Sequence, residues 1–245
     1  MVEPLTKAVS ATAERQMRQW TIGLEVQERV EHEHAISQLA RQIHPYIAIS
    51  RDAGTGAEEL ARRIGARLGW DVLDKELLEV MAEKFHLEKA MLQVVDETTT
   101  SWMLEVFGKW ISQQVVTNSE YVTRLGKVLI MAARHASIVF VGRGAQFVLP
   151  RERCLAVQII APLQMRLERV MQQDGLNLDE AKRHLKKKDA ERRAWLKEHF
   201  GHDVTDPHLY DLVINLERTT LDTAADLIVR ACQQRFSSGP IATPH

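Results

Sequence analysis

Short apolar runs alternate with stretches of helical periodicity along most of the chain. Each run spans about five residues, the usual length of a strand, and the run at 137–141 is almost wholly apolar, as expected for a strand buried on both faces of a parallel sheet. The runs predict strands at residues 46–50, 70–74, 137–141, 155–160 and 211–215. With the helices between them, they predict the α/β class: a five-stranded parallel sheet with helices on both faces.

The spacing of apolar residues marks the helices. Leu60, Ile64 and Leu68 recur every four residues and Gly69 follows, which predicts a helix with one apolar face and a left-handed stop. Further helices are predicted at residues 75–85, 87–95, 102–116, 121–134, 163–173, 179–197 and 221–234. Residues 75–135 contain far more helix than a βαβ crossover needs, so we interpret them as a helical insertion that covers one side of a site.

The first 44 residues form a separate segment in this interpretation. Between Ala11 and His44 there is no proline and only one glycine, and apolar residues recur at loosely helical intervals. We predict an N-terminal helical extension that lies across the domain or against a second subunit, as in a homodimer, and a solvated arm is the alternative. Pro45 marks the start of the main domain, residues 45–236, and residues 237–245 follow it as a tail.

Composition narrows the class of protein. At 245 residues and 45% hydrophobic content the chain can bury a complete core, and its formal net charge of −1 gives no overall attraction to nucleic acid or to an anionic membrane. No apolar run approaches the roughly 20 residues that span a bilayer, and residues 1–10 lack the apolar core of a signal peptide. We therefore expect a cytoplasmic protein without membrane or nucleic-acid partners. Cys154 and Cys232 are predicted to be buried thiols, and the ten histidines lack the spacing of a zinc site.

The stretch after the first predicted strand carries candidate chemistry. It reads Ser50-Arg51-Asp52-Ala53-Gly54-Thr55-Gly56-Ala57-Glu58-Glu59. A glycine loop between a strand and a helix directs backbone N–H groups and the positive end of a helix dipole at one point, where a phosphate can bind. The usual phosphate loop, G-x-x-x-x-G-K-[ST], has glycine where this chain has Ser50, lysine where it has Ala57 and Ser or Thr where it has Glu58. An ordinary turn between strand and helix is therefore the alternative.

Two further features are cationic. Arg143 follows the strand at 137–141 between two glycines, at the edge where open α/β sheets bind ligands, and its planar guanidinium can hold phosphate oxygens bidentately. In the highly charged stretch 179–197, Lys188, Arg192 and Trp195 share one helical face. Such a helix can close over phosphates during transfer, although a charge run is more often a solvated face.

Taken together, five stretches resemble the cytidylate kinase-like family, relatives of the nucleoside monophosphate kinases with an altered phosphate loop. The matching stretches are residues 49–56, 73–77, 141–145, 189–192 and 210–215. The resemblance covers roughly residues 46–236 and implies the P-loop fold of the nucleoside monophosphate kinases. It also implies that residues 75–135 form the acceptor side and residues 175–206 the lid.

The same resemblance implies the parts of an ATP- and magnesium-dependent kinase. The donor phosphates would lie on the loop, at Ser50, Arg51, Gly54, Thr55, Gly56, Ala57, Glu58 and Glu59. The acceptor nucleotide would contact Asp74, Arg143, Asp189 and Arg192, the last three of which would also act in catalysis. Asp52 and Glu59 are the candidate magnesium ligands, because carboxylate oxygens suit this hard cation.

Departures from the family pattern leave two functions open. Family members also lack the loop lysine but commonly carry arginine in place of Glu58, and Val141 stands where cytidylate kinases have an acid. The first hypothesis is phosphoryl transfer from ATP to a nucleoside monophosphate such as CMP, or to a related small phosphate acceptor, because positioning and cations suffice for this chemistry. The second is a non-catalytic nucleotide-binding regulatory or assembly module that keeps the kinase fold.

Overall fold

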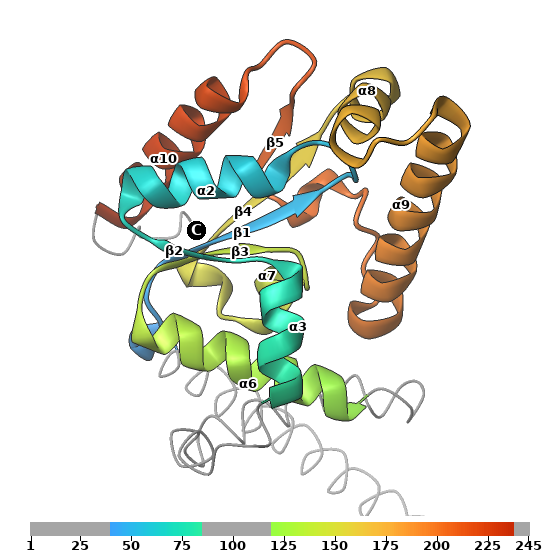
Figure 1. The fold of residues 1–245 in the computed structure, drawn as a ribbon. Coiled ribbons are helices and arrows are strands. Elements are labelled where there is room, and N and C mark those ends of the chain that lie inside the picture. Colours follow the sequence, from blue (N-terminus) through green and yellow to red (C-terminus); the bar gives the residue numbers. More distant parts are fainter. Residues whose placement is uncertain (1–39, 85–118, 238–245) are drawn as a thin grey trace, which may run out of the picture.

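Five parallel strands form the centre of the molecule (Figure 1). The computed structural model describes residues 40–84 and 119–237. The strands are β1 (Tyr46–Arg51), β2 (Asp71–Leu73), β3 (Ile138–Val141), β4 (Cys154–Ile160) and β5 (Leu212–Asn215). Their order is β2-β3-β1-β4-β5, and each neighbouring pair is parallel. The predicted fold class is confirmed, and each predicted strand is present to within a residue at either end.

Helices account for most of the rest of the described chain. They are α2 (Ala57–Leu68), α3 (Lys75–Lys84), α6 (Ser119–His135), α7 (Ala145–Val148), α8 (Leu163–Asp174), α9 (Leu178–Phe200) and α10 (Leu221–Ser237), with short 3-10 turns at Arg151–Arg153 and Pro207–Leu209. Each predicted helix in the described ranges is present, but α9 and α10 each extend three residues beyond their predicted ends at 197 and 234. In the described ranges, no helix is both long enough and apolar enough to cross a bilayer.

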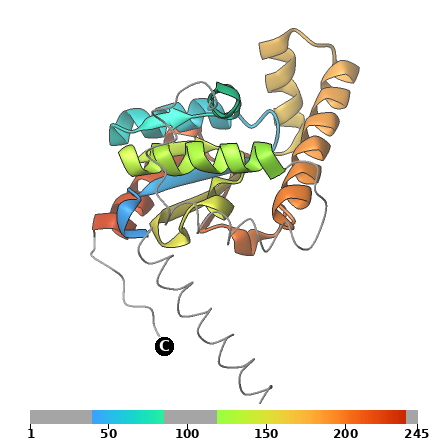
Figure 2. The same ribbon diagram turned by 90° about the horizontal axis from the view of Figure 1, so that it is seen from below.

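Helices cover both faces of the sheet. On one face, Leu60 and Ile64 of α2 and Ile228 of α10 pack on the sheet as a fully buried cluster. On the other face, Leu129 of α6 packs with Phe140 of β3, and Figure 2 shows α6 running across this face. The sheet is therefore buried on both sides, which explains why its central strands are mostly apolar. Both cysteines are buried and unbridged, as predicted.

The connections from the central strands diverge toward opposite faces. The chain leaves β1 through α2 on one face, whereas it leaves β3 through α7 on the other face. Because β1 and β3 are neighbours, their carboxyl ends border a crevice at the topological switch point of the sheet, where open α/β folds bind ligands.

Helices α8 and α9 form a pair at the end of the sheet toward which the strands point (Figure 1). Leu167 and Val170 of α8 pack with Leu185 of α9 and with Ala53 of the loop after β1, in a small core of their own. A capping box at Asn177 and Glu180 fixes the start of α9. The pair therefore packs on the loop that follows β1, and the last turns of α9 pack through Leu196 and Phe200 in the core on one face of the sheet.

Several predictions concern residues outside the described ranges. These are the helices at 87–95 and 102–116, most of the N-terminal extension with its suggested role in a homodimer, and the tail. The assignment of residues 75–135 as an insertion and of residues 175–206 as a lid also stays a prediction.

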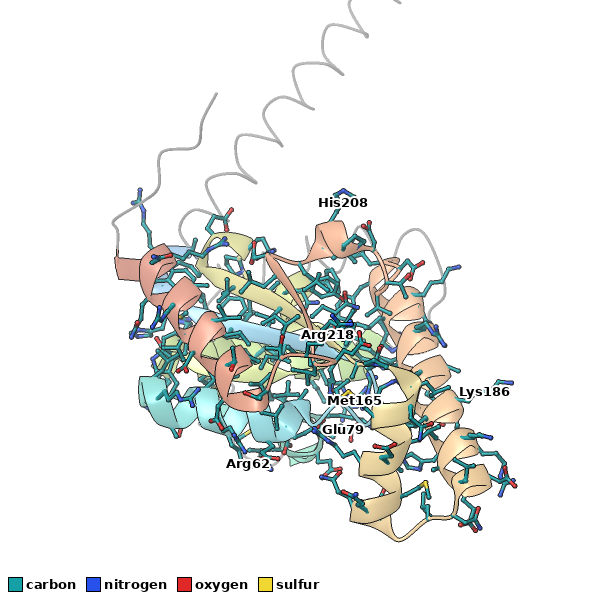
Figure 3. The ribbon with its side chains drawn as sticks, turned by 90° about the horizontal axis from the view of Figure 1, so that it is seen from above. Arg62, Glu79, Met165, Lys186, His208 and Arg218 are labelled. Carbon is teal, nitrogen blue, oxygen red and sulfur yellow. The ribbon has the colours of Figure 1, made fainter. Side chains whose placement is uncertain are left out.

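Replacing Ile64 with valine tests the packing of α2 on the sheet. Ile64 is fully buried, so removing one methyl group should lower the free energy of unfolding by about 0.5–1.5 kcal/mol in chemical denaturation. Arg62, which points outward from the same helix in Figure 3, offers the matched control, and Arg62→Ala should change stability by less than about 0.5 kcal/mol. Equal effects of the two substitutions would contradict this packing.

Candidate functional site

The glycine loop, residues 52–56, joins β1 to α2 at the switch point. Gly54 and Gly56 have φ of 76° and 78°, and Gly56 is the N-cap of α2 without a side-chain cap. Because glycine has no side chain, the N-cap of α2 offers no side-chain oxygen to the first N–H groups of the helix. A loop of this shape can receive an anion at the positive end of the helix dipole.

Two arginines of α8 support the loop from outside the cavity. Arg166 donates from Nη1 to the carbonyl oxygen of Ala53 at 3.2 Å, and Arg169 donates to the carbonyl oxygen of Thr55. A side chain at position 56 would collide with the guanidinium of Arg169, because a Cβ there would lie 1.5 Å from Nη1. Gly56 is thus required by its backbone angle, and a side chain in its place would also displace the guanidinium of Arg169 from the loop.

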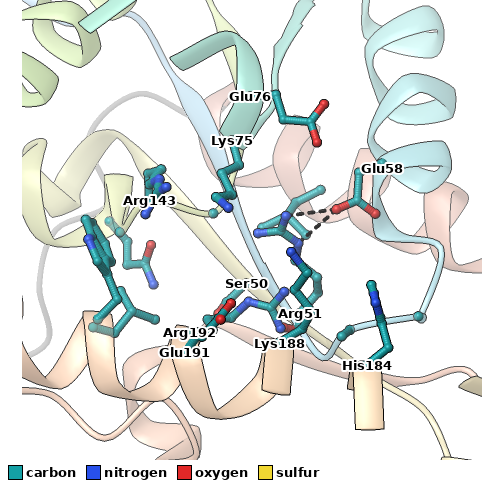
Figure 4. Close-up of a pocket in the computed structure, with 18 residues that line it drawn as sticks. Ser50, Arg51, Glu58, Lys75, Glu76, Arg143, His184, Lys188, Glu191 and Arg192 are labelled. Atoms are coloured by element: carbon teal, nitrogen blue, oxygen red, sulfur yellow. Dashed lines mark hydrogen bonds and ion pairs between the residues drawn. The ribbon is translucent and has the colours of Figure 1, made fainter. Parts of the chain in front are cut away.

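A cavity of about 410 Å³ lies beside the loop, at the carboxyl ends of β1 and β3 (Figure 4). Its charged lining consists of Arg51, Lys75, Arg143, Lys188 and Arg192 together with Glu58, Glu76 and Glu191. These side chains come from β1, α2, α3, α9 and the turn after β3, so no single segment of the sequence defines the site. Figure 4 shows the cationic side chains around one space, where they can bind several anionic oxygens.

Arg143 is placed by an unusual turn after β3. Gly142, Arg143 and Gly144 have φ of 81°, 56° and 65°, so three successive residues are in the left-handed region. The guanidinium lies 4.7 Å from the centre of the Trp195 ring and forms an ion pair with Glu79 of α3. Arg143 therefore connects the end of β3 to both α3 and α9.

The cations of the cavity destabilise one another's charge. Burial, followed by the nearby charge of Arg51, lowers the pKa of Arg143 and of Arg192 to about 10 in each case. Burial and the charges of neighbouring cations also lower the pKa of Lys75. Both arginines stay protonated at neutral pH, so a bound polyanion would relieve this repulsion.

Asp189 of α9 binds the glycine loop rather than the cavity. Its Oδ1 accepts the N–H of Ala53 at 2.8 Å, and its Oδ2 lies 2.7 Å from Nη1 of Arg166. Arg192, one turn further along α9, lies 3.3 Å from Oδ1 of Asp189 and donates to the carbonyl oxygen of Arg51 at 2.7 Å. This network ties α9 to the loop, and Arg192 also lines the cavity.

The structure brings together about half of the residues predicted for the site. The cavity is lined by Ser50, Arg51, Gly54, Glu58, Arg143 and Arg192. Its lining does not include Asp52, Thr55, Gly56, Ala57, Glu59, Asp74 or Asp189. Asp74 accepts the N–H of Leu77 at 2.9 Å, as a cap of α3, and Glu59 forms an ion pair with Arg63 one turn along α2.

Sequence reasoning missed Lys75, Arg166 and Arg169. Lys75 follows the predicted strand end at Asp74, so its position at the strand edge was a signal that could have found it. Arg166 and Arg169 are three residues apart on a helix predicted correctly, and this spacing places them on one face. Only the tertiary packing shows that this face contacts the glycine loop.

Magnesium is the cation that the family implies, and the residues at the loop suit it in part. Among the described residues no group of three or more His, Cys, Asp or Glu side chains could hold a metal ion by itself. Magnesium beside a nucleotide needs only one or two carboxylates, because phosphates and water supply its other ligands. Glu58 lines the cavity and could serve, whereas Glu59, bound to Arg63, lies outside the lining.

The half-buried Asp52 is the second carboxylate near the loop. Burial raises its pKa, an effect that Arg166 partly offsets and Asp189 increases. A nearby cation would favour its charged form. Like Glu59, Asp52 lies outside the lining of the cavity, so its predicted role as a magnesium ligand stays a prediction.

A parallel sheet in this strand order, with a glycine loop and a cationic cavity at its switch point, defines a P-loop protein of the kinase class. The model of the cytidylate kinase-like family matches residues 46–218, and the chain belongs to that family. This membership identifies it as a kinase-like, nucleotide-binding P-loop protein.

Curated relatives agree with this assignment, and a solved structure shares the fold. The chain is 28% identical to a cytidylate kinase of Methanopyrus kandleri over 194 residues, which cover 76% of this chain and 91% of the relative. It is 26% identical to a cytidylate kinase of Pyrococcus horikoshii, over 70% of this chain and 80% of the relative. The crystal structure of an uncharacterized protein from Eubacterium ventriosum has a similar fold, with a TM-score of 0.63 and 20% identity over 78% of this chain and 99% of that one.

Proposed function

We propose that the protein transfers the γ-phosphoryl group of ATP to the phosphate of a nucleoside monophosphate, CMP or a close analogue. The observation that carries this proposal is the convergence of five cationic side chains on one cavity beside the glycine loop. Two phosphorylated substrates that meet there would add negative charge beside cations that lower one another's pKa. CMP is the acceptor that the names of the relatives suggest.

The geometry supports a division of the cavity into two sides. The loop and the start of α2 would hold the phosphates of ATP, while Arg143 and Lys75 would hold the acceptor phosphate. An oxygen of the acceptor phosphate attacks the γ-phosphorus, and the bond from that phosphorus to the bridging oxygen of ADP breaks, which yields ADP and a nucleoside diphosphate. Magnesium, when bound with ATP, would neutralise part of the phosphate charge.

Arg192 is suited to stabilise charge during transfer. It lines the cavity, and its bonds to the Arg51 carbonyl and to Asp189 fix its position next to the loop. We propose that Asp189 acts by positioning Arg192 and the loop, because both of its oxygens are already bound. The contact of Asp74 with the acceptor stays a prediction: Asp74 caps α3 and lies next to Lys75, which lines the cavity.

A coupled assay that detects ADP, run with ATP, magnesium and a panel of nucleoside monophosphates, tests the proposal. We expect turnover with CMP or a close analogue, and loss of turnover in Arg143→Ala and Arg192→Ala. Absence of turnover with every acceptor, or unchanged rates in both variants, would contradict the proposal.

Two contacts that the protein's own side chains make at the loop favour a second function. The N–H of Ala53 already bonds to Asp189, and Arg51 is bound by Glu58. Glu58 stands where the usual phosphate loop has a Ser or Thr. A nucleotide-binding regulatory or assembly module that does not transfer phosphate would tolerate both features. It predicts ATP binding without phosphorylation of any member of the panel, so the same assay separates the two functions.

A further inference from the structure

Arg51 lies at the centre of the cationic cavity. It is the last residue of β1, its side chain is only 8% exposed, and it lines the cavity next to the glycine loop. After burial, its charge is the main cause that lowers the pKa of Arg143 and of Arg192. Arg51 makes it less favourable for two other arginines to carry their charge. The stability of the fold alone therefore does not explain why Arg51 is buried there.

We propose that Arg51 supplies the positive charge that the lysine supplies in an ordinary phosphate loop, and that Glu58 positions its guanidinium for the phosphates of ATP. This inference rests on the proposed binding of ATP at the loop. Ala57 stands where the ordinary loop has that lysine. Its side chain is buried and uncharged, so it cannot supply a positive charge to a phosphate.

The contacts of Arg51 leave donors for a ligand. Its Nε and Nη2 both donate to Oε1 of Glu58, at 3.1 and 2.8 Å, as the dashed lines of Figure 4 show. A guanidinium has five N–H donors, so this contact with Glu58 fixes its plane without using all of them. The charge of Arg51 in turn keeps the pKa of Glu58 below its ordinary value, although burial alone would raise it.

The turn after β3 leaves room for this guanidinium. A Cβ at position 142 would lie 2.2 Å from Nη1 of Arg51, so Gly142 allows an approach that any other residue would block. Arg51 is thus held between the start of α2 and the end of β3. These are the two sides of the crevice in which a phosphate chain would lie.

The other cations near the loop have different tasks. Arg166 and Arg169 donate to loop carbonyls and are not among the residues that line the cavity. Lys75 and Arg143 belong to α3 and to the turn after β3, on the proposed acceptor side. Among the cations that line the cavity, Arg51 is the one that directly precedes the loop in the chain.

Titration calorimetry of the full chain with ATP and with inorganic tripolyphosphate tests the inference. Arg51→Met should weaken binding of both probes by about tenfold, which corresponds to one charge-assisted hydrogen bond. Arg51→Lys, which keeps the charge, should retain most of the affinity. Arg62→Met, on the exposed side of α2, is the matched control and should bind like the unmodified protein.

The role of Glu58 is tested in a double-mutant cycle. Glu58→Ala alone should weaken binding of ATP severalfold, and Glu58→Gln, which keeps an acceptor oxygen for Arg51, should restore it. In the Arg51→Met background, Glu58→Ala should instead strengthen binding, because it removes an unpaired negative charge beside the phosphates. A merely structural role of Glu58 would give the same sign in both backgrounds and would contradict the positioning role.

The outcomes separate this inference from the proposed function. If Arg51→Met binds ATP and tripolyphosphate as tightly as the unmodified protein, or loses affinity for ATP but not for tripolyphosphate, the inference is wrong even if the enzyme phosphorylates CMP. If both affinities fall but no acceptor is phosphorylated, the inference stands and the proposed transfer is wrong. Should Arg51→Met unfold, the Arg51→Met/Glu58→Gln variant removes both charges, and it should still bind tripolyphosphate at least threefold more weakly.

Discussion

Arg143→Ala should lower kcat/KM for the acceptor by about a hundredfold or more, the largest effect on activity that we expect for any cavity residue. The guanidinium lies at the carboxyl end of a central strand, in the cavity, over the ring of Trp195. A bidentate contact to the acceptor phosphate from this position would both bind the acceptor and orient its attacking oxygen. Alanine removes the charge and the planar fork together.

Arg143→Lys separates these two contributions, because lysine keeps the charge but not the fork. We expect it to recover only part of the lost activity in the coupled assay. Arg230, exposed on α10, provides the control, and Arg230→Ala should leave kcat/KM unchanged. Full activity in Arg143→Ala would show that the acceptor phosphate binds elsewhere.

Asp189→Ala should lower the free energy of unfolding by about 2–3 kcal/mol, because it removes the partner of two arginines and of a loop N–H at once. The Asp189 carboxylate is 15% exposed and the Arg166 side chain 13%, so solvent replaces little of the lost contact. The N–H of Ala53 would also lose its acceptor. The loss should be larger than for an ordinary surface ion pair.

Chemical denaturation of the variant measures this loss, with thermal unfolding as a second readout. Glu198, exposed on the same helix, provides the control, and Glu198→Ala should change stability by less than about 0.5 kcal/mol. Asp189→Asn keeps an oxygen for the Ala53 N–H but loses the charge, so its loss of stability should lie between those of Asp189→Ala and Glu198→Ala. If Asp189→Ala were as stable as the Glu198 control, the network that joins α9 to the loop would contribute nothing to the fold.

Many of the strands and helices could be predicted from local patterns, because the apolar residues of each pattern mark the face of the strand or helix that must be buried. The run at 137–141 was predicted as a strand buried on both sides, and Val139 and Phe140 are fully buried in β3. The four-residue repeat of Leu60, Ile64 and Leu68 likewise marked the side of α2 that packs on the sheet.

The candidate site was less predictable. The positions of Arg143 and of the glycine loop could be inferred, since both follow apolar strands and the carboxyl ends of parallel strands share one edge. The distant partners of Asp189 could not. Asp189 binds a loop N–H and Arg166, which are 136 and 23 residues away in the chain, and no spacing rule relates such positions.

By itself, the sequence determined the order of strands and helices, the switch-point edge as the place of the site, and the family. The first two depend on hydrophobic periodicity and on turn residues, which act over a few neighbouring positions, and the family depends on the resemblance of five short stretches. Only the tertiary structure decided which charges meet: Arg51 with Glu58, Arg143 with Glu79 and Trp195, and Asp189 with the glycine loop. Charge interactions act through space, so their partners are set by how the helices pack on the sheet and not by distance along the chain.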